Sequence, residues 1–172
     1  MFRLPPVVAL FSLLVTAPCT AQQRIEYGDY QLDNGLRVIL VEDHSVPVVT
    51  IDLWYDVGSG SERPGRGGFA HLFAHMMYQG SANVQKSEML QLIERAGGQM
   101  NATPNEDRTM YYQTLPSNRL NLGLWLEADR MRSLAITKEN LDNQREAVKE
   151  ERRLRVDNQP YAWAIAEAPY TI

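Results

Sequence analysis

Apolar and polar residues alternate in two segments near the start of the chain, and each segment predicts a β-strand. The first segment follows Asn34-Gly35, a dipeptide typical of tight hairpin turns, and runs from Leu36 to Val41. The second is the β-rich segment 46–59, which ends in glycines. We therefore expect two neighbouring strands here, followed by a loop over residues 58–68, which are rich in glycine, serine and arginine.

The spacing of apolar residues then changes to one typical of helices. From Phe69 to Tyr78 only two histidines interrupt the apolar residues, which predicts a helix buried on most sides and ended by Gly80. Ser87 is expected to cap the start of a second helix, EMLQLIERA, and Gly97-Gly98 to end it.

The second half of the chain predicts one more strand and two more helices. Residues 101–116 are expected to form a loop and then a strand centred on residues 109–114. A further helix should begin near Ser117 and carry a set of residues at helical spacing, Leu120, Leu124, Ala128 and Met131. Thr137 is expected to cap a last, long helix.

The first 21 residues have the pattern of a secretory signal peptide. Arg3 supplies a basic start, an apolar run extends from Val7 to Val15, and small residues at Cys19 and Ala21 predict cleavage after Ala21. The apolar run is too short to serve as a stable membrane anchor. We therefore expect an exported protein, periplasmic or secreted.

Composition is that of one ordinary globular domain, with 172 residues, 44% of them hydrophobic and 22% charged. Loss of Arg3 with the signal segment changes the net charge from −4 to −5, so nothing favours a nucleic-acid partner. The single cysteine lies within the signal segment, so the exported chain has none with which to form a disulfide.

The histidines of the first predicted helix are the first candidate metal ligands. Successive helical residues rotate by about 100°, so His71 and His75 lie about 40° apart on one face and can reach one ion. A helical histidine pair is also common in protein cores and on surfaces. The metal-ligand interpretation is favoured here because buried imidazoles need partners for their ring nitrogens, and a metal ion would supply one.

A third ligand is predicted near the end of the chain, in NQREAVKEERRLR, residues 143–155. The same rotation places Glu151 on the face defined by the apolar residues of this helix, Leu141, Ala147, Val148 and Leu154, with Glu150 about 100° away. A buried carboxylate needs a cation. A metal ion would meet that need, but so would a nearby arginine, Arg145, Arg152 or Arg155.

Four segments together resemble the pitrilysin, insulinase and mitochondrial processing peptidase family of zinc endopeptidases. They are GGFAHLFAHMMYQGS, AGGQMNATPNEDRTMYY, LEADRMRSL and NQREAVKEERR, and the resemblance spans Leu32 to Tyr161. These enzymes are inverzincins, which carry the motif HxxEH. The resemblance implies an α+β fold in which an antiparallel or mixed sheet packs against helices, as in the N-terminal half of a processing-peptidase-like domain.

The resemblance also implies roles for individual residues. His71, His75 and Glu151 would bind one Zn²⁺, with the fourth position left open. Position 74, which holds the general base in the family, is alanine here. Gln144 occupies a position where many relatives carry a supporting glutamate, and it can still orient a ligand by hydrogen bonding.

The stretch GGQMNA resembles the family's edge strand, so Asn101 and Ala102 are expected to bind a peptide or unfolded polypeptide that adds to the sheet. Family members are longer. Residues 22–172 are therefore expected to form the zinc-site portion of a metallopeptidase domain, incomplete at its C-terminus and completed by a second homologous domain or subunit.

Three hypotheses follow. In the first, the chain is a zinc metalloendopeptidase domain that Ala74 renders inactive or nearly so. In the second, it is a non-catalytic peptide-binding or partner subunit of the same family. In the third, the histidines and Glu151 are only polar core residues.

Overall fold

The structure is a computed structural model, and it describes residues 25–162 in two compact units that divide after Ser45. The predicted signal segment lies outside the described residues. The first unit is an antiparallel hairpin of β1 (Gly28–Gln31) and β2 (Arg37–Leu40). Gly35 has φ +88°, and the Leu36 N–H donates to Asn34 Oδ1, so the predicted Asn-Gly turn is confirmed.

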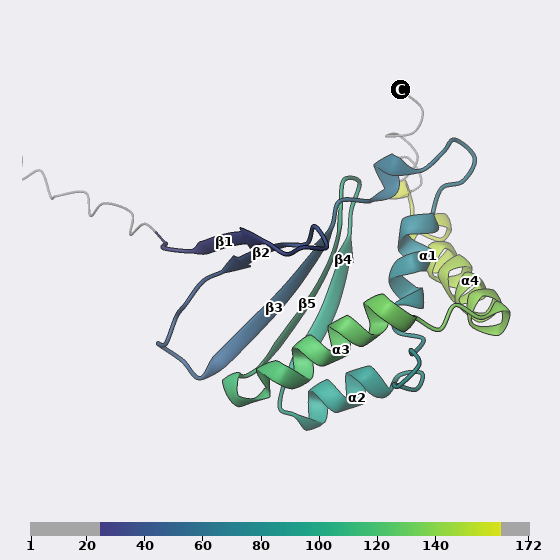
Figure 1. Cartoon of the computed structure of the whole chain (residues 1–172). Helices are drawn as coiled ribbons and strands as arrows, with labels where there is room; N and C mark the ends of the chain where they lie inside the picture. The colour runs from purple at the N-terminus through teal and green to yellow at the C-terminus, as the bar shows by residue number, and fades with distance from the viewer. Residues whose placement is uncertain (1–24, 163–172) are drawn as a thin grey trace, which may run out of the picture. The chain divides into compact units, whose positions relative to one another are not determined.

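The second unit contains a three-stranded antiparallel sheet in the order β3-β5-β4 (Figure 1). Its strands are β3 (Val48–Tyr55), β4 (Gln99–Pro104) and β5 (Thr109–Pro116). The strands predicted at β3 and β5 are confirmed. β2 pairs with β1 through the tight turn and β3 pairs with β5, so the described residues form no ladder between the first two predicted strands.

Residues 99–104 form a strand, which corrects the loop predicted from residue types and agrees with the family resemblance. Asn105 closes the turn to β5: its N–H donates to the Arg108 carbonyl, and its side chain accepts the N–H groups of Asp107 and Arg108. β4 pairs only with β5, so it is an edge strand of the described sheet. Pro104 fits such a strand, where a missing N–H disrupts no second ladder.

Helices α2 (Glu88–Arg95) and α3 (Leu120–Ser133) cover one face of the sheet (Figure 1). The core between them consists of buried apolar side chains, namely Val84, Met89, Ile93, Leu115 and Leu126. Gly123 of α3 lies directly against Ile51 and Leu115, which allows the helix to approach the sheet closely.

The face of α3 that its apolar spacing indicates is not the buried one. Leu120, Leu124 and Met131 are exposed, as is Ala128. The buried face instead holds Glu127 and Arg130, which pair with each other and, through Glu127, with Gln113 of β5. A charged pair can replace apolar residues in a core when its hydrogen bonds are made within the protein.

The ends of α2 differ in how well they were predicted. Gly98 N–H donates to Ile93 O and Gly97 N–H to Glu94 O, which is the Schellman motif expected of a glycine stop. Ser87 does occupy the N-cap position, but its hydroxyl makes no capping hydrogen bond. Its φ of +62° lies outside the extended conformation that capping side chains require.

The remaining α-helices, α1 (Phe69–Met76) and α4 (Lys138–Arg152), lie side by side (Figure 1). A π-helical turn, η3 (Arg153–Asp157), continues α4. The Thr137 cap is confirmed, because its hydroxyl accepts the Asn140 N–H at 3.1 Å. The expectation that α1 is buried on most sides is wrong, since Phe69 and Phe73 are exposed. Within residues 25–162, none of the helices has the length and apolar character needed to cross a bilayer.

Candidate metal centre

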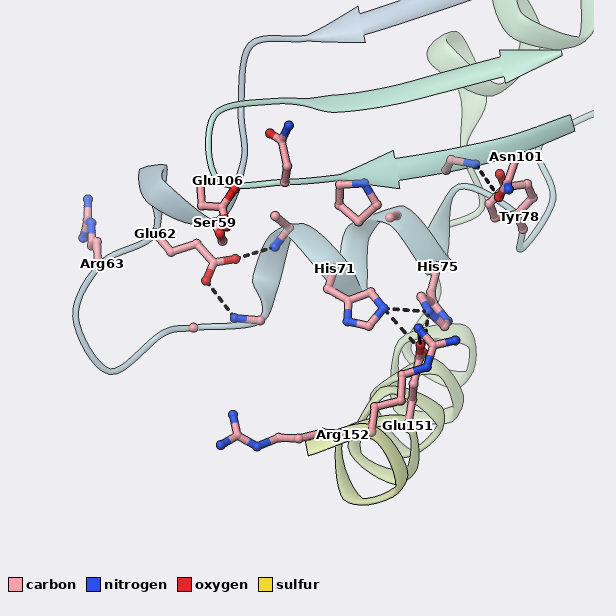
Figure 2. Close-up of a pocket in the computed structure, with 18 of the residues that line it drawn as sticks. Ser59, Glu62, Arg63, His71, His75, Tyr78, Asn101, Glu106, Glu151 and Arg152 are labelled. Carbon is pink, nitrogen blue, oxygen red and sulfur yellow. Dashed lines mark hydrogen bonds and ion pairs between the residues drawn. The ribbon is translucent and has the colours of Figure 1, made fainter. Parts of the chain in front are cut away.

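Three potential metal-ligand atoms from α1 and α4 converge on one point (Figure 2). The Nε2 atoms of His71 and His75 lie 3.2 Å apart. Glu151 Oε2 lies 3.4 Å from the first nitrogen and 3.3 Å from the second. The structure therefore brings together all three residues that the sequence nominated as metal ligands.

These separations fit a tetrahedral zinc ion. Zinc binds imidazole nitrogen at about 2.0–2.1 Å and carboxylate oxygen at about 2.0–2.2 Å, so tetrahedral angles place two ligand atoms about 3.3–3.5 Å apart. The three observed distances, 3.2, 3.3 and 3.4 Å, match that spacing closely. Two imidazoles and one carboxylate also form a donor set common in catalytic zinc sites.

The surroundings orient the ring of His75 and favour the neutral, metal-binding form of His71. Gln144 Oε1 lies 3.2 Å from His75 Nδ1 and accepts its proton, so in the neutral ring the lone pair is on Nε2, which faces the other two ligands. Burial lowers the pKa of His71 below its usual 6.5, and this outweighs the opposite effect of Glu151. The neutral form of His71 therefore predominates at pH 7.

The alternative partner for Glu151 is present as well. Arg155 Nη1 lies 2.6 Å from Glu151 Oε1, the oxygen that does not face the histidines. Of the other two candidate arginines, Arg145 pairs with Asp142, and Arg152 lies 3.6 Å from Asp157. The two hypotheses for Glu151 are thus compatible, because each uses a different carboxylate oxygen.

The start of α1 is fixed by a residue that sequence reasoning missed. Glu62, in the preceding loop, accepts the N–H of Gly68 at 2.7 Å and that of Ala70 at 2.6 Å. A carboxylate at a helix N-terminus stabilises its unpaired N–H groups. Glu62 therefore anchors the turn from which His71 projects. The bend of the loop brings Glu62 to the start of α1, and the spacing of residues in the sequence does not predict that bend.

A cavity of about 1200 Å³ adjoins the three ligand atoms. His71, His75 and Glu151 line it, together with the methyl group of Ala74 from the same face of α1. A metal ion bound by the three ligands would thus have an accessible fourth position. Ala74 offers no proton acceptor at that wall.

The edge strand β4 forms another wall of the cavity, through residues that include Met100, Asn101 and Ala102. Asn101 and Ala102, nominated from the family resemblance, therefore lie at the same cavity as the histidines. The Ala102 N–H donates to Asn101 Oδ1 at 2.8 Å (Figure 2). This backbone donor thus has a side-chain acceptor, which an incoming peptide carbonyl could replace.

Together, the fold and the site define a class: an α+β domain with a potential His-His-Glu metal centre beside an exposed sheet edge. The profile of the family described as Insulinase (Peptidase family M16) matches residues 37–166. The chain belongs to this family of peptidases, many of whose members are named zinc proteases, and the expected family and α+β fold are confirmed.

Individual relatives agree with this assignment. The chain is 35% identical to the zinc protease PqqE of Helicobacter pylori, over 86% of this chain and 34% of the relative. It is 27% identical to the probable mitochondrial-processing peptidase subunit beta of Arabidopsis thaliana, over 83% of this chain and 26% of the relative.

Solved structures give the same result. A protease from Helicobacter pylori superposes with a TM-score of 0.78 at 32% identity, covering 81% of this chain and 34% of that chain. Pitrilysin superposes with a TM-score of 0.69 at 27% identity, covering 78% of this chain and 14% of that chain. The chain thus spans about a third or less of the length of these proteins.

Proposed function

We propose that this chain forms the zinc-binding part of an M16 metalloendopeptidase domain, in which His71, His75 and Glu151 bind one Zn²⁺. The observation that carries the proposal is the mutual spacing of the three ligand atoms, 3.2–3.4 Å. Bound zinc lowers the pKa of its water ligand to about 7 and polarises a carbonyl group. The membership of the family supports zinc as the ion.

We further propose that the substrate is an extended peptide or unfolded polypeptide that adds to β4. Main-chain hydrogen bonds to a sheet edge bind peptides with little demand on their sequence. The carbonyl of such a peptide would take over the Ala102 N–H from Asn101, whose side chain would then be free to bind the peptide. The cavity beside this edge has room for the peptide side chains.

Ala74 limits the rate at which this site could hydrolyse a peptide. In HxxEH the glutamate accepts a proton from water and delivers it to the leaving amine. A positioned acid–base group of this kind contributes about 10²- to 10⁴-fold to the rate. Another carboxylate that lines the cavity, Glu62, is held by both oxygens to backbone N–H groups at the start of α1. We therefore propose that the chain binds zinc and peptide but hydrolyses peptides slowly or not at all.

A second function is favoured by the same residue. A site with its metal ligands intact and alanine at position 74 suits a non-catalytic peptide-binding or partner subunit. Relatives of this chain include proteins named as subunits, among them cytochrome b-c1 complex subunit 1 of Bos taurus at 29% identity. By the same argument, we propose that a second homologous domain or subunit completes the peptide site.

The zinc site is tested by metal analysis of the purified chain. We expect one zinc per chain, lost in His71→Ala and retained in His44→Ala. His44 is a suitable control because its side chain is 91% exposed in the other unit. Zinc absent from the unaltered chain, or present equally in both variants, would overturn the proposal.

Ala74→Glu separates the two functions, with Ala74→Gln as a control of the same size that lacks a base. Both are loaded with zinc and given an unstructured fluorogenic peptide. Zinc-dependent cleavage by Ala74→Glu alone supports the disabled protease. Peptide binding by both without cleavage by either, with and without an added homologous domain or subunit, supports the partner subunit and overturns the first function.

Export is a separate proposal that rests on residues 1–21. Expression of the full chain in a bacterium, followed by N-terminal sequencing of the periplasmic or secreted protein, should give a chain that begins at Gln22. An uncut chain retained in the cytoplasm contradicts it.

A further inference from the structure

The carboxylate of Glu151 is held at both of its oxygens. Oε2 lies 3.3–3.4 Å from the two imidazole nitrogens, while Oε1 lies 2.6 Å from Arg155 Nη1. A guanidinium–carboxylate contact of this length is a charge-assisted hydrogen bond. The carboxylate side chain is 22% exposed, whereas the arginine side chain is 77% exposed. The arginine therefore reaches the half-buried site from its solvent side.

Arg155 lies in a local change of helix type, one turn beyond Glu151. α4 ends at Arg152, and the chain continues as the π-helical turn η3. The Asn158 N–H donates to the Arg153 carbonyl at 2.9 Å, a bond that spans five residues instead of the four of an α-helix. Glu151 and Arg155 are four residues apart, the spacing at which two side chains on one helical face meet. Single π-turns in α-helices are frequent at functional sites.

We propose that Arg155 is a positioning residue for the metal centre: by holding Oε1, it makes Glu151 present only Oε2 to the ion. The inference rests on the proposed function, since it assumes that zinc binds here. A carboxylate free to offer both oxygens would fill an additional coordination position. One that offers a single oxygen leaves the fourth position open on the side of the cavity, as catalytic zinc requires.

The size of the effect follows from comparable contacts. Loss of a partner that orients a metal ligand weakens metal binding by about 10- to 100-fold. The fold itself should tolerate the change, because an ion pair with so exposed an arginine adds little to stability. The chain also supplies a matched control, Arg153, which lies in the same π-turn and pairs at 2.9 Å with Glu150 instead.

The test compares Arg155→Met, Arg155→Lys and Arg153→Met with the unaltered chain. Zinc dissociation constants are measured by competition with a chromophoric chelator, and visible absorption spectra are recorded after loading with Co²⁺. Four-coordinate Co²⁺ absorbs several-fold more strongly than five-coordinate Co²⁺, so the spectrum reports how many oxygens Glu151 supplies. Thermal unfolding without metal checks that each variant is folded.

We expect Arg155→Met to bind zinc at least about tenfold more weakly and to show a weaker Co²⁺ spectrum, with partial recovery in Arg155→Lys and no change in Arg153→Met. Constants and spectra that are the same in Arg155→Met as in Arg153→Met would overturn the inference while leaving the zinc site intact. Failure of the unaltered chain to bind either metal would instead refute the proposed function.

Discussion

Gln144 offers a quantitative test of how the metal centre is supported. Its Oε1 accepts the Nδ1 proton of His75 at 3.2 Å and so fixes which ring nitrogen faces the other ligands. Gln144→Leu keeps a side chain of similar length and removes the acceptor. The imidazole can then rotate, and its Nδ1–H is left to water.

The magnitude follows from the exposure of the histidine. Removing a hydrogen-bond partner of a ligating imidazole weakens metal binding by about 10- to 100-fold. Because the His75 side chain is 30% exposed, water can replace part of the lost bond, and we expect the lower end of that range. Tenfold corresponds to about 1.4 kcal/mol. In excess zinc the unfolding temperature should fall by about 3–6 °C as a result.

The assay is zinc competition with a chromophoric chelator, together with thermal unfolding in zinc and in a chelator. Gln144→Glu is the informative counterpart, because a carboxylate makes a stronger hydrogen bond to Nδ1 and should tighten zinc binding. Asn143→Leu, at an exposed neighbouring position, controls for the added apolar surface. Equal zinc affinities in Gln144→Leu and Asn143→Leu would refute the reasoning, as would a loss of stability that is the same with and without zinc.

Two further predictions concern the framework around the site. In Gly123→Ala the new Cβ would lie 2.6 Å from Ile51 Cδ1 and 2.8 Å from Leu115 Cδ1. This overpacking should cost about 1–3 kcal/mol, more than the gain of about 1 kcal/mol in helix propensity, so the variant should be less stable. An increase in the free energy of unfolding, measured in urea, would contradict this prediction. Hydrogen bonds, first from the Ser81 hydroxyl, lower the pKa of Asp129 below 3.8, so its stabilising contribution is present above pH 3.8 and is lost as pH falls through the lowered value. The gap in unfolding free energy between the unaltered chain and Asp129→Asn should therefore narrow in acid, and a constant gap down to pH 2 would refute this assignment.

Most features that depend on neighbours in sequence were predictable, although the capping hydrogen bond expected of Ser87 did not form. The Asn-Gly turn, the glycine stop of α2 and the Thr137 cap each rest on contacts within about five residues, and each formed as expected. The pairing of His71 with His75 is local in the same sense, because helical rotation alone places both on one face. The family resemblance added what spacing could not give, the edge strand β4.

Features that depend on what packs against an element required the tertiary structure. The apolar residues of α3 predicted the wrong buried face. The Glu127–Arg130 pair is buried because Glu127 accepts a hydrogen bond from Gln113 of the sheet, whereas no described residues bury Leu124 to a comparable extent. The rotation per residue along a helix predicted the direction of Glu151, but it could not predict whether the partner of its carboxylate is a metal ion or an arginine.

Within residues 25–162, the amino-acid sequence by itself determined the turns, caps and helical spacing that bring single ligands to the right faces, because backbone geometry repeats over a few residues. The tertiary structure decided that α1 and α4 lie side by side and that Glu151 divides its two oxygens between the histidines and Arg155. Contacts between residues about eighty positions apart depend on how whole elements pack, which no local pattern encodes.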